Sequence, residues 1–260
     1  MFNTTINLKS AFQSPLEQFE ILPLIPNFLG VTITNETIIL IITLLFIYIF
    51  FKTMFKQTDS TLFLVPHRWQ VIIEIIYKMV LSLVTDNISG DKGQFFFPLV
   101  FTLFFFIVSL NLIGLVPYSF TLTSHLVVTF SLSIAIFIGI NIICVRLHGF
   151  EIFSLFFPAG SSLALAFLLV PVEVMSYVFR PISMGIRLFA NMMAGHTLLK
   201  VFAGFAWALM SCTGILFFAH FIPLLVIFPL YGLELGVALI QAFVFSLLTC
   251  MYLNDAINLH

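Results

Sequence analysis

Runs of about 20 apolar residues, separated by only a few charged ones, constrain this chain more than any other feature of its sequence. Of the 260 residues, 61% are hydrophobic and 8% are charged, whereas soluble domains carry about 25% charged residues. An apolar run of this length can cross a bilayer as a helix, in which every backbone N–H and C=O is paired internally. A barrel would show alternating polar and apolar residues, which are absent. The sequence therefore predicts an all-α integral membrane protein.

The apolar runs predict about five membrane helices and one surface helix. Residues 62–84 differ from the other runs, because apolar residues recur at helical spacing while Arg68, Glu74 and Lys78 interrupt them. This pattern is typical of an amphipathic helix that lies on the membrane surface. Residues 1–28 are expected to form an N-terminal tail or a removable leader, and residues 29–260 a single membrane domain. The expected spans are 29–51, 95–116, 122–145, 161–205 and 223–253.

The last two spans are longer than a perpendicular crossing requires. Strong tilt absorbs excess length, so residues 161–205 and 223–253 are expected to form a long, strongly tilted helical hairpin. The basic residues before this hairpin fall on one common side if the N-terminus lies outside. They are Lys52, Lys56, Arg68, Lys78, Lys92 and Arg146. Five spans then place the C-terminus inside.

Ionisable residues within the hairpin are the main functional candidates, because a charge at mid-membrane costs at least about 2.5–3.5 kcal/mol. They are Glu173, Arg180, Arg187, His196, Lys200, His220, Glu234 and Asp255. For Arg180, Lys200 and His220, internal ion pairing or snorkelling to the interface is the simpler interpretation. Arg187 differs, because small neighbours make one side of its helix thin, as the close approach of a neighbouring subunit requires. These neighbours are Gly185, Ala190, Asn191, Ala194 and Gly195.

Position numbers indicate which polar residues share a depth. In an antiparallel hairpin, residues at equal depth have position numbers with a constant sum. This sum is 428 for Glu173 with Asp255, 428 for Arg187 with Gln241, and 430 for His196 with Glu234. The sequence thus predicts a carboxylate pair toward the inside, Arg187 in the middle, and His196 toward the outside. At 100° per residue, His196 lies on the helix face opposite Arg187, so the outer level is offset sideways.

Two offset polar levels on either side of a fixed positive charge argue against a continuous proton wire. An arginine stays protonated in proteins and repels a proton. Transit past Arg187 would therefore require a mobile carrier, such as a membrane carboxylate on another subunit.

Several strings in the sequence resemble one known family. They are SMGIRLFANMMAGH at residues 183–196, GLELGVALIQAFVF at 232–245 and the ending YLNDAINLH. All three closely resemble subunit a of mitochondrial and alphaproteobacterial F-type ATP synthases. SPLEQFEILPLIP near the start and PYSFTLTSH at 117–125 are similar to the plant-type mitochondrial version. The resemblance covers nearly the whole chain from Ser14 onward.

The resemblance implies a role for each site residue. The stator arginine of the family, which separates two aqueous half-channels, falls on Arg187. The outer half-channel falls on His196 and Glu234, with Asn191 and Gln241 as polar support. The matrix half-channel falls on Glu173, with Asp255 near the same exit. His196 and Glu234 are also a possible site for inhibitory zinc, since imidazole and carboxylate both ligate this metal.

The resemblance further implies a subunit that couples transmembrane proton flow to rotation of a c-ring and to ATP synthesis. The expected partners are the c-ring, peripheral-stalk subunit b, other membrane-sector subunits and the lipid bilayer. The expected location is the mitochondrial inner membrane, with the N-terminus toward the intermembrane space and the C-terminus toward the matrix. No catalytic site of its own, cofactor or resident metal is expected, and no P-loop string is present.

Other functions remain as alternatives. The same machine could be coupled to sodium. An independent channel or secondary transporter would be indicated by inverted repeats with interrupted helices, and a haem-binding redox subunit by two histidines at equal depth on facing helices. A net charge of −1 gives no indication of a nucleic-acid partner.

Overall fold

The computed structural model describes residues 16–28, 31–56, 68–88, 92–116, 119–149, 163–210 and 218–258. Residues 1–15 of the expected tail, and Pro117 and Tyr118 of the PYSFTLTSH string, lie outside the described residues. Six long helices make up most of the described chain: α2 (Asn35–Lys56), α3 (Arg68–Asn87), α4 (Lys92–Gly114), α5 (Leu126–His148), α6 (Leu163–Met210) and α8 (Phe221–Ile257). All of these except α3 are long and apolar enough to cross a membrane. The predicted helical fold, with five spans and two long C-terminal helices, is confirmed.

A small β-hairpin precedes the first helix. Strand β1 (Pro23–Phe28) pairs antiparallel with β2 (Val31–Thr34), and a short 3-10 turn, η1 (Glu17–Phe19), lies before it. Asn35 joins the hairpin to α2: its Oδ1 accepts from the backbone N–H of Leu22 at 3.3 Å, and its Nδ2 donates to the carbonyl of Glu20 at 3.1 Å. The first helix therefore begins at Asn35, later than the expected residue 29. The reason is that the β-branched residues from Val31 to Thr34 form a strand.

The amphipathic helix α3 packs by its apolar face. Val80, Leu83 and Val84 are buried, and α3 contacts α4 and α8. On the opposite side, Lys78 and Glu74 form an exposed ion pair at 2.8 Å. A helix with one apolar face and one charged face fits a membrane surface better than its interior.

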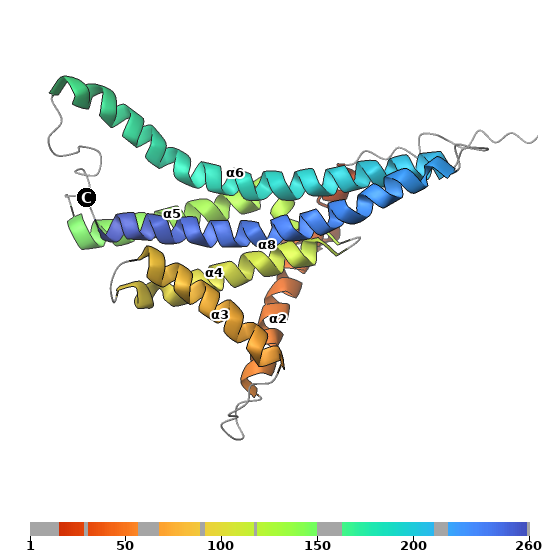
Figure 1. Cartoon of the computed structure of the whole chain (residues 1–260), viewed down its shortest axis with the longest axis horizontal. Coiled ribbons are helices and arrows are strands. Elements are labelled where there is room, and N and C mark those ends of the chain that lie inside the picture. Colours follow the sequence, from red (N-terminus) through yellow and green to blue (C-terminus); the bar gives the residue numbers. More distant parts are fainter. Residues whose placement is uncertain are drawn as a thin grey trace, which may run out of the picture.

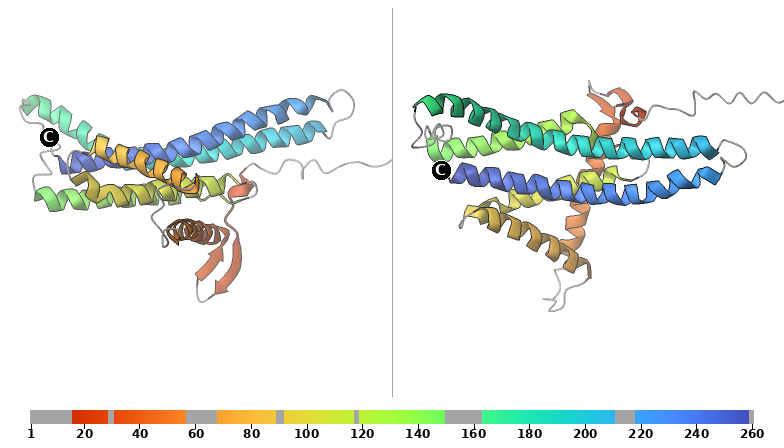
Figure 2. Two further views of the ribbon diagram at one scale, coloured as in Figure 1. Left: turned by 60° about the horizontal axis from the view of Figure 1, so that its bottom comes forward. Right: turned by 45° about the horizontal axis from the view of Figure 1, so that its top comes forward.

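Helices α4 and α5 run in opposite directions and are joined through a second 3-10 turn, η2 (Leu122–Ser124), and α8 packs against both of them (Figure 1). The turn packs against α6 as well as against α2, α4 and α5. Helices α4, α5, α6 and α8 run side by side along the length of the molecule, whereas α2 crosses them at a steep angle (Figures 1 and 2).

The two C-terminal helices are unusually long. Helix α6 has 48 residues and α8 has 37, which correspond to roughly 72 and 56 Å at about 1.5 Å per residue. Helix α6 bends in its N-terminal half (Figure 1), where Pro171 and Pro181 each remove a backbone donor from the helix. Gly185 lets α6 approach α5 closely, since a Cβ there would lie 3.1 Å from the Cα of Phe130.

Candidate functional site

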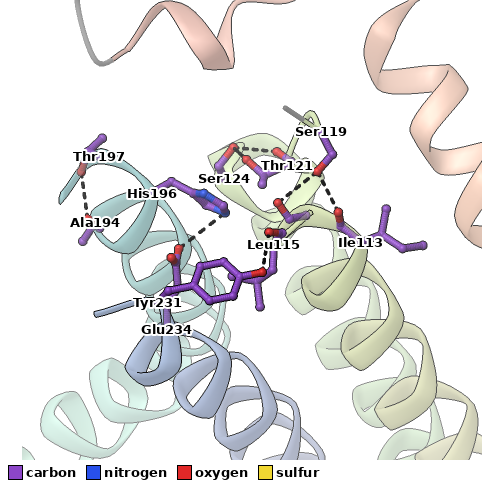
Figure 3. Close-up of polar contacts among 11 residues, drawn as sticks. Ile113, Leu115, Ser119, Thr121, Ser124, Ala194, His196, Thr197, Tyr231 and Glu234 are labelled. Atoms are coloured by element: carbon purple, nitrogen blue, oxygen red, sulfur yellow. Dashed lines mark hydrogen bonds and ion pairs between the residues drawn. The ribbon is translucent and has the colours of Figure 1, made fainter. Parts of the chain in front are cut away.

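The most enclosed polar contact of the α6–α8 hairpin joins His196 and Glu234. Nε2 of His196 lies 3.6 Å from Oε1 of Glu234, and the two side chains are only 15% and 5% exposed. Figure 3 shows His196 pointing from α6 toward the carboxylate on α8. The contact agrees with the equal depth expected from the position numbers.

The surrounding residues leave polar atoms of this pair without hydrogen-bond partners. Within the described part of the chain, Nε2 of His196 and both carboxylate oxygens of Glu234 are buried without a hydrogen-bond partner. Buried polar atoms in proteins almost always have a partner, whether protein, water or ion. A histidine and a carboxylate with free hydrogen-bonding capacity at this distance can pass a proton between them or to a water molecule.

A pocket opens beside the pair, between α6 and α8. It has a volume of about 220 Å³, and Asn191, Gly195, Leu233 and Glu234 are among the residues that line it. Asn191 thus lies at the same pocket as Glu234. Most of the lining is apolar, so the carboxylate is the strongest polar group that faces the pocket.

The small residues around Arg187 fall into two groups, and the expected thin helix side is corrected for its two glycines only. Gly185 faces Ser133 and Phe130 of α5, and Gly195 faces Glu234 of α8. Ala190 and Ala194 are exposed. The glycines serve helix packing within the chain, a use that spacing along one helix cannot distinguish from contact with a partner.

More unpaired polar atoms come from segments near this end of the hairpin. The amide of Asn111 in α4 donates to the carbonyl of Ala238 at 3.0 Å, while its Oδ1 is buried without a partner in the described chain. Oγ1 of Thr123 and Nε2 of His125 are also buried without a hydrogen-bond partner in the described chain. The ring of Phe19 packs edge-on against the ring of His196, with 6.5 Å between the two ring centroids. Sequence reasoning missed these residues. For Asn111, the signal was a carboxamide inside a span of mean hydropathy 2.4.

Polar contacts also hold the α4–α5 connection beside the pair. The hydroxyl of Ser119 donates to the carbonyl of Ile113 at 2.7 Å, and that of Thr121 donates to Ser124 Oγ at 2.7 Å. Tyr231 of α8 donates to the carbonyl of Leu115 at 3.2 Å (Figure 3). These bonds fix η2 and the end of α4 against α8.

A second polar cluster lies toward the other end of the hairpin, around Arg180. Arg180 donates to Oδ2 of Asp255 at 2.9 Å, and its guanidinium lies over the rings of Tyr177 and Tyr252, 5.4 and 5.1 Å from their centroids. Tyr177 also donates to Oδ1 of Asn141 on α5. The interpretation of Arg180 as an internally paired charge is confirmed.

The expected carboxylate pair of Glu173 with Asp255 is corrected by this cluster. Asp255 is the ion-pair partner of Arg180, which follows Glu173 by two helical turns. A constant sum of position numbers assumes two straight, parallel axes, whereas α6 bends in its N-terminal half (Figure 1), which contains Pro171 and Pro181. The register found from His196 and Glu234 therefore does not extend to the N-terminal half of α6.

Arg187 lies between the two clusters and differs from Arg180. Its side chain is exposed, and within the described residues it forms no ion pair. Gln241 is half-buried on α8 and makes no hydrogen bond to Arg187 in that part of the chain. Glu173 is half-exposed on α6. The structure thus brings His196 against Glu234 and places Asn191 at the pocket that Glu234 lines. Within the described residues, Arg187, Gln241 and Glu173 form no hydrogen bond or ion pair with one another.

The described residues contain no group of three or more His, Cys, Asp or Glu side chains that could hold a metal ion. His196 and Glu234 supply only two ligand side chains, so a metal ion bound there would need water or a second molecule to complete its coordination.

The chain is similar to known proteins over most of its length. Residues 37–254 match the model of the family described as "ATP synthase A chain". The chain is 51% identical over 252 residues to "ATP synthase subunit a" of Pylaiella littoralis, which covers 96% of this chain and 100% of that protein. It is 48% identical over 250 residues to "ATP synthase subunit a" of Chondrus crispus, covering 95% and 97% of the two chains. The protein of the same name from Brassica napus is 48% identical over 255 residues, which cover 95% of this chain and 97% of the relative.

Proposed function

Since the chain belongs to the ATP synthase A chain family, we propose that Arg187 is its stator charge and that separate proton paths lie at the two ends of the α6–α8 hairpin. The chain is the proton-conducting stator subunit of the membrane sector of an ATP synthase, and it has no catalytic site of its own. The observation that carries the proposal is the contrast along α6: Arg187 is exposed and unpaired within the described residues, and it lies between an enclosed His–Glu pair and a neutralised Arg–Asp pair.

The outer path uses His196 and Glu234. Their free hydrogen-bonding atoms and the adjacent pocket support transfer of a proton from water to the rotor. Asn191 lines that pocket, and Gln241 follows Glu234 by two turns on the same face of α8. Both supply polar support for the same path.

The inner path uses Glu173. This carboxylate precedes Arg187 by 14 positions in the sequence, or about 21 Å along the helix. It can accept a proton from the rotor carboxylate before that carboxylate returns to Arg187, and Asp255 lies toward the same end of the hairpin. Because Arg187 separates the two paths, a proton cannot move directly from one to the other.

The coupling step is electrostatic. The positive charge of Arg187 favours the ionised form of a carboxylate on a ring of c subunits. A carboxylate protonated through the outer path enters the lipid neutral, and it loses its proton on the inner side before it meets Arg187 again. The energy available is about 2.3 kcal/mol per proton for each 100 mV of membrane potential.

The dimensions of the helices support a strongly tilted hairpin. The apolar part of α2 has 18 residues, or about 27 Å, which matches a hydrocarbon core of about 30 Å when the helix is nearly perpendicular. Helices α6 and α8 cross α2 at a steep angle (Figure 1) and are roughly two to three times as long as its apolar part. They therefore run obliquely through the membrane, and a ring of c subunits is the partner that fits along them.

The location and the remaining partners follow from the same premise. The chain is a multi-pass membrane protein similar to subunit a of plants and algae. We place it in the mitochondrial inner membrane with its N-terminus toward the intermembrane space and its C-terminus toward the matrix. Other subunits of the complex are its partners, among them peripheral-stalk subunit b.

The substitution Arg187→Ala tests the proposal. ATP synthesis per assembled complex should be abolished, while the amount of complex on native gels stays close to normal, because an exposed side chain supports no internal packing. Arg146→Ala is the matched control, since Arg146 is also an exposed arginine, in the last turn of α5. Normal ATP synthesis in the Arg187→Ala variant would show that Arg187 is not the stator charge.

A further inference from the structure

Helix α6 carries a second arginine whose charge is cancelled inside the chain. Arg180 is 23% exposed and forms an ion pair with Asp255 at 2.9 Å. Both Asp255 and Tyr252, which stacks on the guanidinium, come from α8. An intramembrane charge is normally paired with an opposite one, and here α8 supplies that partner.

Arg180 and Arg187 lie on the same face of α6. Seven residues make two turns, so the two side chains start only about 20° apart around the helix and about 10 Å apart along it. Tyr252 of α8 lies within electrostatic range of both guanidinium groups. A carboxylate that approaches Arg187 therefore passes near Arg180 as well.

Of these two arginines, only Arg180 has a carboxylate partner within the described residues. Resting on the proposed role of Arg187, we infer that Asp255 is a masking counterion, which neutralises Arg180 so that the rotor carboxylate meets a single arginine on this face. The tyrosines cannot do this, because an aromatic ring attracts a cation but leaves its net charge unchanged. Asp255 would then act by cancelling charge and need not carry a proton.

Without the negative charge of Asp255, the rotor carboxylate would meet two positive charges in succession, those of Arg180 and Arg187. On the inner side, where the proton leaves, Arg180 would attract the ionised rotor carboxylate. This would happen either before the carboxylate reached Arg187 or after the carboxylate had passed Arg187. Each such position is an additional energy minimum that slows rotation. The defect would be slow turnover in a complex that still assembles.

Four variants of the assembled enzyme in vesicles test this inference: Asp255→Asn, Arg180→Met, and Asp255→Asn combined with either Arg180→Met or Arg180→Lys. Methionine keeps an apolar stem of similar length but has no charge. The measurement is ATP-driven proton pumping per assembled complex. Asp255→Asn should lower pumping by about tenfold. Arg180→Met, and the double variant that contains it, should pump within about twofold of the parent. The double variant with Arg180→Lys keeps the cation and should stay impaired.

Glu74→Gln is the matched control, because it also removes the carboxylate partner of a cation, Lys78, but on α3. It should leave pumping unchanged. The inference is overturned if Asp255→Asn pumps normally. It is equally overturned if the methionine double variant stays as impaired as Asp255→Asn, since Asp255 would then carry protons itself. A loss confined to assembly, with normal pumping per complex, would also overturn it and leave the ion pair a structural one.

Failure of this inference is distinguishable from failure of the proposed function. Arg187→Ala measured in the same vesicles reports on the stator charge alone. If Arg187→Ala abolishes pumping and the methionine double variant is not restored, only the masking role of Asp255 is lost.

Discussion

Gly195 gives the carboxylate of Glu234 the space that any side chain at position 195 would occupy. A Cβ built at this glycine would lie 2.6 Å from Oε1 and 2.9 Å from Cδ of Glu234. Carbon and oxygen atoms cannot approach so closely, so the carboxylate and α6 fit together only because residue 195 has no side chain.

The first prediction concerns this fit. Gly195→Ala should displace Glu234 from His196 and lower proton flow per assembled complex by about tenfold or more, since even a small misplacement of a transferring group costs much of the rate. Gly204→Ala is the control, because a Cβ there meets nothing within 4 Å. Passive proton flow in vesicles freed of the catalytic head measures the effect. Equal flow in the two variants would show that Glu234 has no fixed position.

The second prediction uses zinc as a probe of the outer path. Two ligands at about 2.1 Å from a tetrahedral zinc ion lie about 3.4 Å apart, close to the 3.6 Å between His196 and Glu234. Zinc added from the outer side should therefore slow proton flow. His196→Ala or Glu234→Gln should weaken this inhibition, whereas Glu173→Gln should not. If proton flow in oriented vesicles is insensitive to outer zinc, the assignment of His196 and Glu234 to the outer path is contradicted.

The third prediction concerns the depth of Gln241. Position numbers place it level with Arg187, although the two side chains share no hydrogen bond in the described residues. Moving the charge across, as Arg187→Gln with Gln241→Arg, should retain more ATP synthesis than Arg187→Gln alone. If both variants lose activity equally, the positive charge cannot be supplied from α8.

The fourth prediction is a pH dependence at the start of α5. Burial lowers the pKa of His125, and the negative charge of Glu36 opposes this shift. The ring lies stacked on Phe120, 4.9 Å from its centroid. Because the folded-state pKa lies below the unfolded value of about 6.5, stability is complete above that value and is lost as pH falls through it toward the folded pKa.

Amide hydrogen exchange in η2 and the first turn of α5 measures this effect. Exchange there, corrected for its intrinsic pH dependence, should indicate weaker protection at pH 5.5 than at pH 7.5. His125→Phe keeps an aromatic ring on Phe120 but cannot titrate, so protection in that variant should not depend on pH. Helix α3 serves as the internal reference. The same loss of protection in both proteins would rule out His125 as its origin.

Much of the helical arrangement could be predicted from the sequence, because runs of apolar residues and breaks between them are properties of the chain itself. The contact of His196 with Glu234 could also be anticipated, since the helices run antiparallel near that level. The pairing of Asp255 with Arg180 could not, because it depends on a bend in α6 whose extent the prolines alone do not determine. The packing of Gly195 on Glu234 was also missed, since a glycine looks the same in a sequence whether it faces α8 or another subunit.

Helix α6 carries Glu173, Arg187 and His196 on one unbroken element, and this limits which changes in chain length the protein can tolerate. One residue inserted between Arg187 and His196 would turn one of them by about 100° relative to the other and move it about 1.5 Å along the axis. A change of rotamer at one position cannot restore the original positions of both the Arg187 and the His196 side chains. A one-residue insertion or deletion in this interval is therefore more damaging than most substitutions, and variation in length among working proteins of this kind belongs outside it.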